Sequence, residues 1–188
     1  MKNKLYRFVR ALGVPLFKLL YRPTIIGISN IPTSGRIVLA GNHTNNFDCA
    51  LLISSTKRTI HFLAKNELHK GKLGWFFTSM GTIPVDRNNK DTNALSTAIE
   101  VLNNNEVIGI FPEGTTTKDG SLLPFKVGAV VMANRTNSKI VPFAITGEYK
   151  LFRKNIKITF ASPYTPKNDI SLANDELRNK VIKLKESN

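Results

Sequence analysis

Two hydrophobic spacings alternate along this chain and predict strands and helices in turn. Short apolar runs bounded by turn residues predict buried strands, and apolar residues three or four positions apart predict helices. The predicted extended segments are 24–28, 36–40, 59–64, 82–85, 106–111, 140–145 and 156–160. The predicted helices are 47–54, 92–103, 127–134 and 172–185. This order indicates one α/β domain with a mostly parallel or mixed sheet flanked by helices.

The first 22 residues follow a different pattern. Their apolar residues form a helical stripe: Leu5, Phe8, Val9, Leu12, Leu16, Leu19 and Leu20. Six cations are interleaved with the stripe: Lys2, Lys4, Arg7, Arg10, Lys18 and Arg22. Gly13 and Pro15 predict a break into two short helices, with Pro15 opening the second.

A basic amphipathic segment of this kind suits a membrane interface. The alternative is a helix that packs on the domain's own core and leaves its cations solvated. We predict that residues 1–22 form a membrane-interface segment and that residues 23–188 form one folded domain. No apolar run reaches the roughly 18 residues that a membrane-spanning helix needs.

The net charge of +14 over 188 residues implies an anionic partner. Nucleic acid, an acidic membrane surface and phosphorylated substrates all fit this charge. The single cysteine, Cys49, excludes an internal disulfide, and no cation neighbours it in sequence. We interpret Cys49 as a small buried hydrophobe. The aromatic segment 73–80 is typical of core, and one alternative is a second membrane contact.

Candidate chemistry collects in the loops that follow predicted strands, where open α/β sheets place their sites. The residues in these loops are His43, Asp48, Lys65, Arg87, Glu113 and Thr115. A histidine and an aspartate five residues apart can form a base and its orienting carboxylate. Such a pair alone is weak evidence for a functional site. Four loops that together supply a base, a carboxylate and two cations predict one.

Absent motifs narrow the chemistry further. The chain lacks a Gly-x-Ser-x-Gly elbow, a phosphate-binding glycine loop and the common zinc patterns, with His61 assigned to a strand and His69 to the surface. Without an activated serine, the His43–Asp48 pair is left to act directly on a hydroxyl of the substrate. The cations would then hold a phosphate.

Four blocks resemble the glycerolipid acyltransferase family, which includes the lysophosphatidic acid acyltransferases. They come in the family's order and at familiar spacing, and together they cover about residues 24–163. The blocks are 42–48 (Asn-His-Thr-Asn-Asn-Phe-Asp), 62–68 with 74–75 and 81–87, 111–115 (Phe-Pro-Glu-Gly-Thr) and 141–145 (Val-Pro-Phe-Ala-Ile).

The resemblance implies transfer of a fatty acyl group from acyl-CoA or acyl carrier protein to the free hydroxyl of lysophosphatidic acid, giving phosphatidic acid. His43 would be the general base and Asp48 would orient it. The substrate-binding residues would be Lys65, Arg87, Glu113, Gly114, Thr115 and Lys126. No metal or other cofactor is implied. For the aromatic segment 73–80, the resemblance adds the lining of an acyl chain as an alternative to core. The enzyme would act at the cytoplasmic face of the cell membrane, bound to anionic lipid, with no nucleic acid as partner.

The third block departs from the family at one position. Thr116 stands where the family usually has arginine, and Lys118 or Lys126 would have to compensate. This departure leaves the acceptor open. The same chemistry on a different lipid or an amine acceptor is one alternative, and a basic nucleic-acid-binding module is another, although the chain shows no reader motif.

Overall fold

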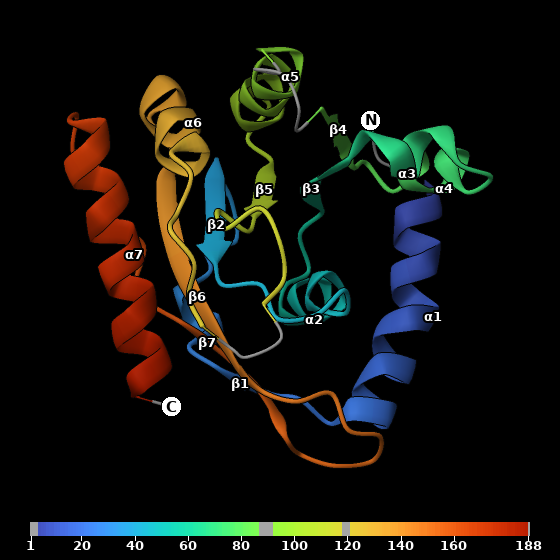
Figure 1. Ribbon diagram of the computed structural model, residues 1–188. Coiled ribbons are helices and arrows are strands. Elements are labelled where there is room, and N and C mark those ends of the chain that lie inside the picture. The colour runs from blue at the N-terminus through green and yellow to red at the C-terminus, as the bar shows by residue number, and fades with distance from the viewer. Residues whose placement is uncertain (1–3, 87–91, 118–120, 188) are drawn as a thin grey trace.

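A seven-stranded sheet with the order β1-β7-β6-β2-β5-β3-β4 forms the centre of the protein (Figure 1). It is seen in a computed structural model that describes residues 4–86, 92–117 and 121–187. The strands are β1 (Thr24–Ile26), β2 (Ile37–Gly41), β3 (Ile60–Lys65), β4 (Ile83–Val85), β5 (Val107–Ile110), β6 (Lys139–Gly147) and β7 (Ile156–Phe160). The helices are α1 (Lys4–Tyr21), α2 (Asp48–Ser55), α3 (Asn66–Lys70), α4 (Gly74–Ser79), α5 (Thr92–Asn103), α6 (Gly128–Thr136) and α7 (Ile170–Glu186), with a 3-10 turn η1 (Ile28–Asn30) after β1.

Five neighbouring strands, β6-β2-β5-β3-β4, run parallel to one another. β7 is antiparallel to β6, and β1 is parallel to β7. The predicted α/β fold with a mixed, mostly parallel sheet is therefore confirmed. Because the five parallel strands share one direction, the loops at their carboxyl ends meet along a single edge of the sheet.

The central strand β2 shows why the sheet needs helices on both faces. Ile37 and Leu39 pack in the core beneath α1 and α2, whereas Val38 and Ala40 pack in the core beneath α5, α6 and α7. All four are essentially inaccessible to solvent. A strand that is apolar on both faces appears in the sequence as a continuous hydrophobic run. The apolar run in the predicted segment 36–40 is of this kind. Burying each large aliphatic side chain contributes about 1.5–3 kcal/mol.

Helix α1 is continuous, so the predicted break at Gly13 and Pro15 is wrong. Pro15 lies inside the helix and is exposed. An interior proline costs roughly 3 kcal/mol because it removes a backbone hydrogen bond and crowds the preceding turn. Burial of Tyr6 before Pro15 and Phe17 after it offsets this cost. Phe17 packs in the core beneath α1 and α2, and the Tyr6 hydroxyl accepts from the backbone amide of Ile60, a residue of the same core.

The aromatic segment 73–80 contains α4 and only partly fits the core interpretation. Phe76 and Phe77 are half-buried and contact each other edge to face. Trp75, however, is 65% exposed, so the core interpretation is wrong for this residue. No helix in the described part of the chain is long and apolar enough to cross a membrane.

Candidate active site

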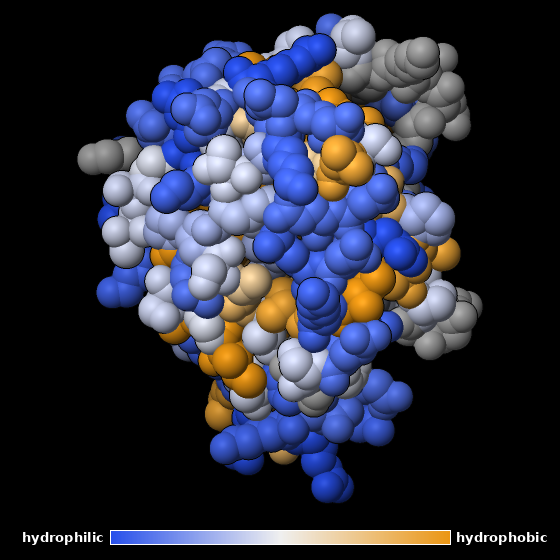
Figure 2. All heavy atoms as spheres, turned by 90° about the vertical axis from the view of Figure 1, so that its left-hand side faces the viewer, coloured by the Kyte–Doolittle hydropathy of each residue, from blue (hydrophilic) through white to orange (hydrophobic). Residues whose placement is uncertain are grey.

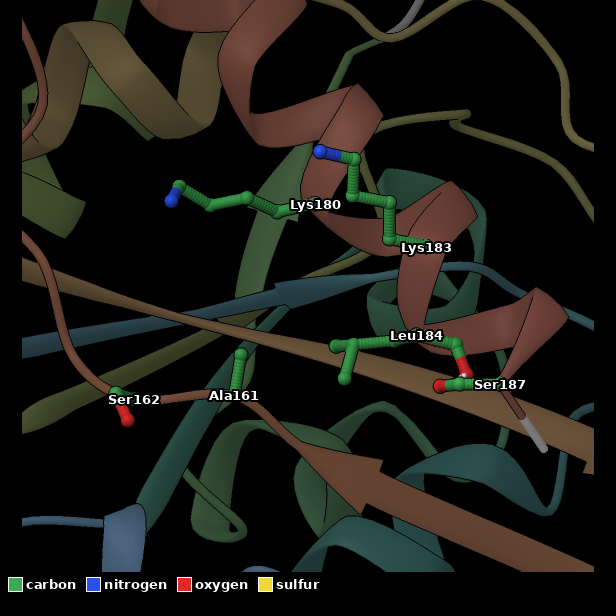
Figure 3. A pocket seen from close by; sticks show the side chains of 6 residues that line it. All are labelled: Ala161, Ser162, Lys180, Lys183, Leu184 and Ser187. Atoms are coloured by element: carbon green, nitrogen blue, oxygen red, sulfur yellow. Dashed lines mark hydrogen bonds between the residues drawn. The ribbon is translucent and has the colours of Figure 1, made fainter.

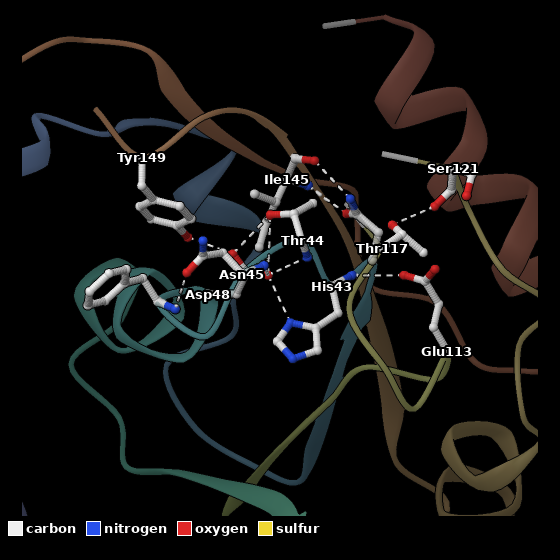
Figure 4. Close-up of polar contacts among 11 residues, drawn as sticks. His43, Thr44, Asn45, Asp48, Glu113, Thr117, Ser121, Ile145 and Tyr149 are labelled. Atoms are coloured by element: carbon white, nitrogen blue, oxygen red, sulfur yellow. Dashed lines mark hydrogen bonds and ion pairs between the residues drawn. The ribbon is translucent and has the colours of Figure 1, made fainter. Parts of the chain in front are cut away.

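His43 and Asp48 lie together at the carboxyl edge of the sheet (Figure 4). His43 follows the end of β2, and Asp48 is the first residue of α2. The imidazole Nδ1 is 2.9 Å from the Asp48 Oδ2 atom. The Asp48 side chain is fully buried, and the His43 side chain remains 17% exposed. The pair is therefore formed as predicted, with the carboxylate inside and the imidazole at the surface of the site.

The Asp48 carboxylate is surrounded by hydrogen-bond donors. Its Oδ2 accepts from the backbone amides of Thr44 (2.6 Å) and Asn45 (2.9 Å). Its Oδ1 accepts from the Tyr149 hydroxyl at 2.6 Å and from the Thr44 hydroxyl at 3.2 Å. These donors offset the cost of burying a charge. With an acceptor-only partner at Nδ1, the proton of neutral His43 resides on Nδ1 and the lone pair on Nε2, where a base needs it.

An aromatic wall fixes the plane of the imidazole. The His43 ring stacks on Phe111, with the ring centroids 4.0 Å apart and an interplanar angle of 12°. Phe111 is the residue after β5 and also contacts Phe62 and Phe143. Rotation of the imidazole would break both the stacking and the bond to Asp48, so the direction of Nε2 is set by two independent contacts.

The backbone on either side of His43 is also anchored. The buried Asn42 side chain donates to the carbonyl of Ile145 at 2.8 Å and accepts from its amide at 2.7 Å, and thereby continues the β2–β6 pairing. Glu113 is buried, and its two oxygens accept from the backbone amides of His43 and Leu123, each at 2.8 Å. Glu113 thus joins the His43 loop to the loop after β5.

Lys126 lies over the turn that follows Glu113. Gly114 has φ +74°, and a Cβ there would come within 3.1 Å of the Lys126 Nζ atom. Glycine is therefore favoured at 114 by its backbone conformation, and the end of the Lys126 side chain lies close to it. Thr115 and Thr116 are exposed in the same turn. Lys126 is thus beside the turn that lacks the family's arginine, whereas Lys118 lies outside the described residues.

Of the two other cations predicted to bind substrate, Lys65 is among the described residues and Arg87 is not. Lys65 is the last residue of β3 and is exposed at the carboxyl edge of the sheet. No contact in the described ranges joins it directly to His43 or Asp48. Arg87 lies outside the described residues, two positions after the end of β4.

Cys49 has no nucleophilic character. Its own burial, followed by the negative charge of neighbouring Asp48, raises the pKa of the Cys49 thiol to about 12. The thiol therefore stays protonated at neutral pH. Cys49 packs against the core beneath α1 and α2 as an apolar residue, but it is partly buried and not fully buried as predicted. Among residues 4–86, 92–117 and 121–187, no three His, Cys, Asp or Glu side chains gather closely enough to hold a metal ion.

The other histidines lie away from this pair. His61 is a strand residue in β3, as predicted, and its ring nitrogens face the Gly81 carbonyl and the Glu106 carboxylate. His69 belongs to α3 and contacts the hydroxyls of Thr78 and Thr82.

A surface hollow of about 410 Å³ lies between α7 and the segment after β7 (Figure 3). Lys180 and Lys183 of α7 and Ser162 are among its lining residues. Lys180 there also sits 4.6 Å above the Tyr164 ring. None of the predicted site residues lines this hollow, so it is separate from the His43–Asp48 pair.

Three contacts of this site escaped the sequence interpretation. Tyr149 is 101 residues from Asp48, and no spacing or motif connects them. Phe111 belongs to a recognised block, but only the geometry shows that its ring packs on His43. Asn42 was part of the first block, and the pattern gave no sign that its side chain would pair with β6.

These features define a class of protein, an α/β fold in which a histidine is held by a buried carboxylate at the carboxyl edge of the parallel strands. A family-wide sequence model described as Acyltransferase matches residues 22–146. The chain belongs to the Acyltransferase family.

Individual relatives agree with this assignment. The chain is 34% identical over 140 residues to the 1-acyl-sn-glycerol-3-phosphate acyltransferase of Bacillus subtilis (strain 168), a match that covers 71% of this chain and 69% of that protein. It is 32% identical over 135 residues to the enzyme of the same name from Borreliella burgdorferi, covering 70% of this chain and 54% of that protein. The matched part thus spans about half to two thirds of the length of these relatives.

The fold has a close counterpart among solved structures. The crystal structure of the 1-acyl-sn-glycerophosphate acyltransferase PlsC from Thermotoga maritima superposes with a TM-score of 0.79. The superposition covers 97% of this chain and 79% of that chain at 22% sequence identity. At this identity the likeness establishes the fold.

Proposed function

We propose that this protein transfers a fatty acyl group from a thioester, either acyl-CoA or acyl carrier protein, to the free hydroxyl of 1-acyl-sn-glycerol 3-phosphate. The product would be phosphatidic acid, an intermediate of phospholipid biosynthesis. The observation that carries the proposal is the buried Asp48 bonded to His43 Nδ1 at 2.9 Å, which leaves Nε2 as a base. The names of the bacterial relatives support the acceptor.

The reaction needs only one proton carrier. His43 Nε2 takes the proton of the acceptor hydroxyl while the oxygen attacks the thioester carbonyl carbon. The tetrahedral intermediate collapses, the carbon–sulfur bond breaks, and the imidazolium returns the proton to the thiolate. Asp48 stabilises the imidazolium between these steps, as a carboxylate does beside a catalytic histidine. No acyl-enzyme, metal or other cofactor takes part.

The acceptor phosphate would be bound by cations at the edge of the site. Lys126 would replace the family's missing arginine, and its closeness to Gly114 supports this role. Lys65 and Arg87 would complete the group. Glu113 would support the site through the backbone and would not contact the phosphate, because its carboxylate oxygens accept hydrogen bonds from two backbone amides. Gly114 and Thr115 would form the turn that faces the phosphate.

The enzyme would work as a peripheral protein on the cytoplasmic face of the cell membrane. An exposed apolar stripe on α1 supports this location: Phe8, Leu12, Leu16 and Leu19 are 55–62% exposed. Their spacing of four, four and three residues puts them on one side of the helix. Cations surround this stripe and suit anionic lipid.

An acceptor screen tests the proposal directly. The purified full chain is supplied with acyl-CoA or acyl carrier protein and with lysophosphatidate, lysophosphatidylethanolamine or an amine acceptor. Thiol release and product mass are measured. Lysophosphatidate should give phosphatidic acid fastest with at least one donor. Preferential acylation of another acceptor would move the protein to a different lipid substrate, and no thiol release with any acceptor would contradict acyl transfer.

Lys126→Gln should raise the KM for lysophosphatidate about tenfold with a smaller change in kcat, because a charge-assisted contact to phosphate is lost. Lys139→Gln is the matched control. Lys139 is also exposed but lies at the opposite end of the parallel strands. Equal KM values for the two variants would remove Lys126 from the phosphate site.

A further inference from the structure

The loop between β6 and β7, residues 148–155, carries two exposed apolar side chains at its tip. Leu151 is 56% exposed and Phe152 is 58% exposed. Neither side chain adds to either core cluster of the described fold. The folding of the domain therefore gives no reason for a leucine and a phenylalanine at these positions.

The backbone conformation of Phe152 is unusual for a residue with a large side chain. Phe152 has φ +59°, in the left-handed region that glycine and asparagine occupy with little strain. A loop that only had to reverse direction would be more stable with glycine there. The aromatic side chain is thus kept at a strained position while its ring faces solvent, which points to a partner outside the folded chain.

The loop tip continues the apolar stripe of α1. The backbone amide of Phe152 donates to the carbonyl of Leu20, in the last turn of α1. Figure 1 shows the loop passing beneath the carboxyl end of α1. Leu19, the last residue of the stripe, is 60% exposed. The helix stripe and the loop tip are therefore neighbouring parts of one side of the molecule.

Cations border this side. Lys150, Arg153 and Lys154 lie in the loop, and Lys18 and Arg22 lie at the end of α1; all five are exposed. The acid of the loop, Glu148, is already paired with Lys150 at 2.7 Å.

The face that carries α7 differs, because hydrophilic side chains predominate there and apolar ones form only small separate patches (Figure 2). Exposed apolar side chains bordered by cations suit the interface of an anionic phospholipid bilayer. The apolar side chains would enter the boundary of the acyl chains, and the cations would bind the lipid phosphates.

We propose that Leu151 and Phe152 form a second membrane anchor, which enters the same leaflet as the stripe of α1. This inference rests on the proposed membrane location and specifies how the enzyme is oriented there. One anchor along a helix leaves the protein free to roll about the helix axis. A second anchor beside the helix end removes that freedom and holds the site at a fixed angle to the lipid surface.

The same loop reaches the catalytic pair. Tyr149, three residues before Phe152, donates its hydroxyl to Asp48. Its ring also contacts Phe17 and Tyr21 of α1 and Phe47 beside Asp48. This aromatic cluster connects α1 and the β6–β7 loop to the segment beside Asp48. The loop proposed to contact lipid therefore also supports the carboxylate that is bonded to His43.

The test uses the full chain with the double substitution Leu151→Ser and Phe152→Gly. Binding to phosphatidylcholine vesicles with and without phosphatidylglycerol is measured by co-sedimentation. The matched control is Leu172→Ser, because Leu172 is also 56% exposed but lies on α7. The double variant should bind anionic vesicles about tenfold more weakly than wild type, and the control should bind normally. Because glycine relieves the strain at 152, the double variant should unfold at the wild-type temperature or higher.

A second variant, Leu12→Ser with Leu16→Ser, separates the two claims. If it loses vesicle binding while the loop variant binds like wild type, the membrane location stands and the second anchor is overturned. If wild-type protein itself fails to bind anionic vesicles, the proposed membrane location fails, and the anchor falls with it. A loop variant that binds weakly and also unfolds early would overturn the anchor in favour of a structural role for the loop.

Discussion

At the scale of single residues, the site depends on keeping one imidazole in one orientation. The Asp48 carboxylate holds Nδ1, Phe111 stacks on the ring, and Asn42 fixes the backbone next to it. Each contact restrains a different degree of freedom, so Nε2 points in a constant direction. The carboxylate in turn is held by four donors besides His43, of which Tyr149 comes from the most distant segment.

Tyr149→Phe should lower kcat about tenfold and leave the KM values for donor and acceptor nearly unchanged, because a buried carboxylate loses one hydrogen bond. Burial, followed by the charge of Asp48, raises the pKa of the Tyr149 hydroxyl, so it remains a protonated donor throughout the neutral range. Steady-state kinetics of the purified variant measures this effect.

Tyr164→Phe is the matched control. The buried Tyr164 hydroxyl has no hydrogen-bond partner within the described parts of the chain. Its removal should leave kcat at the wild-type value. A Tyr149→Phe enzyme with normal kcat, or one whose KM rises instead, would show that Tyr149 does not position Asp48.

At the scale of elements, regular segments were predictable where the local apolar pattern is uninterrupted. β7 and α5 coincide with their predicted ranges, and β2 and α2 are shifted by a single residue. β7 and α5 each bury a periodic apolar face, and β2 buries both of its faces, so the apolar residues seen in the sequence are the ones that pack in the fold.

Helix α1 shows where local rules fail. Gly13 and Pro15 are helix breakers by propensity, but tertiary burial of Tyr6 and Phe17 decides the outcome. The contact of Tyr149 with Asp48 was likewise beyond local pattern, because it arises from strand pairing between segments a hundred residues apart. The loops around His43 were predictable as a group, since parallel strands bring their carboxyl ends to one edge.

Pro15→Ala should stabilise the protein by about 1–3 kcal/mol, because the helix regains a hydrogen bond and loses a steric conflict. Urea unfolding of the purified variant gives the free energy. Gly35→Ala is the contrasting control. Gly35 has φ +79° and no atom within 4 Å of a built Cβ, so alanine should destabilise through backbone strain alone. Unfolding of Pro15→Ala at a lower urea concentration than wild type would show that α1 depends on the proline.

At the scale of the whole molecule, the positive charge and the exposed apolar residues of α1 and the β6–β7 loop suit contact with an anionic membrane surface. The net charge is +14, and no acid lies before Asp48 in the sequence. The exposed apolar residues of α1 and the β6–β7 loop lie on one side, and the site edge of the sheet is joined to that side by the aromatic cluster around Tyr149. This arrangement supports the proposed membrane location.

Binding to anionic vesicles should weaken strongly with salt, while a residual apolar component persists. The screening length falls from about 10 Å at 0.1 M salt to about 3 Å at 1 M, which suppresses the attraction of cations to lipid phosphate. Co-sedimentation across this range measures the effect, with neutral phosphatidylcholine vesicles as the reference. Binding that is independent of both salt and lipid charge would show that the +14 charge serves another partner.

The central claim is that His43 acts as the base in acyl transfer, and single-site kinetics tests it most directly. The purified full chain, His43→Ala and Cys49→Ala are compared for thiol release from an acyl thioester with lysophosphatidate as acceptor. Loss of general-base catalysis should reduce kcat of His43→Ala about a hundredfold to ten-thousandfold. Cys49→Ala should keep the wild-type rate, because its thiol, with a pKa of about 12, takes no part. A His43→Ala enzyme with the wild-type rate would contradict the account.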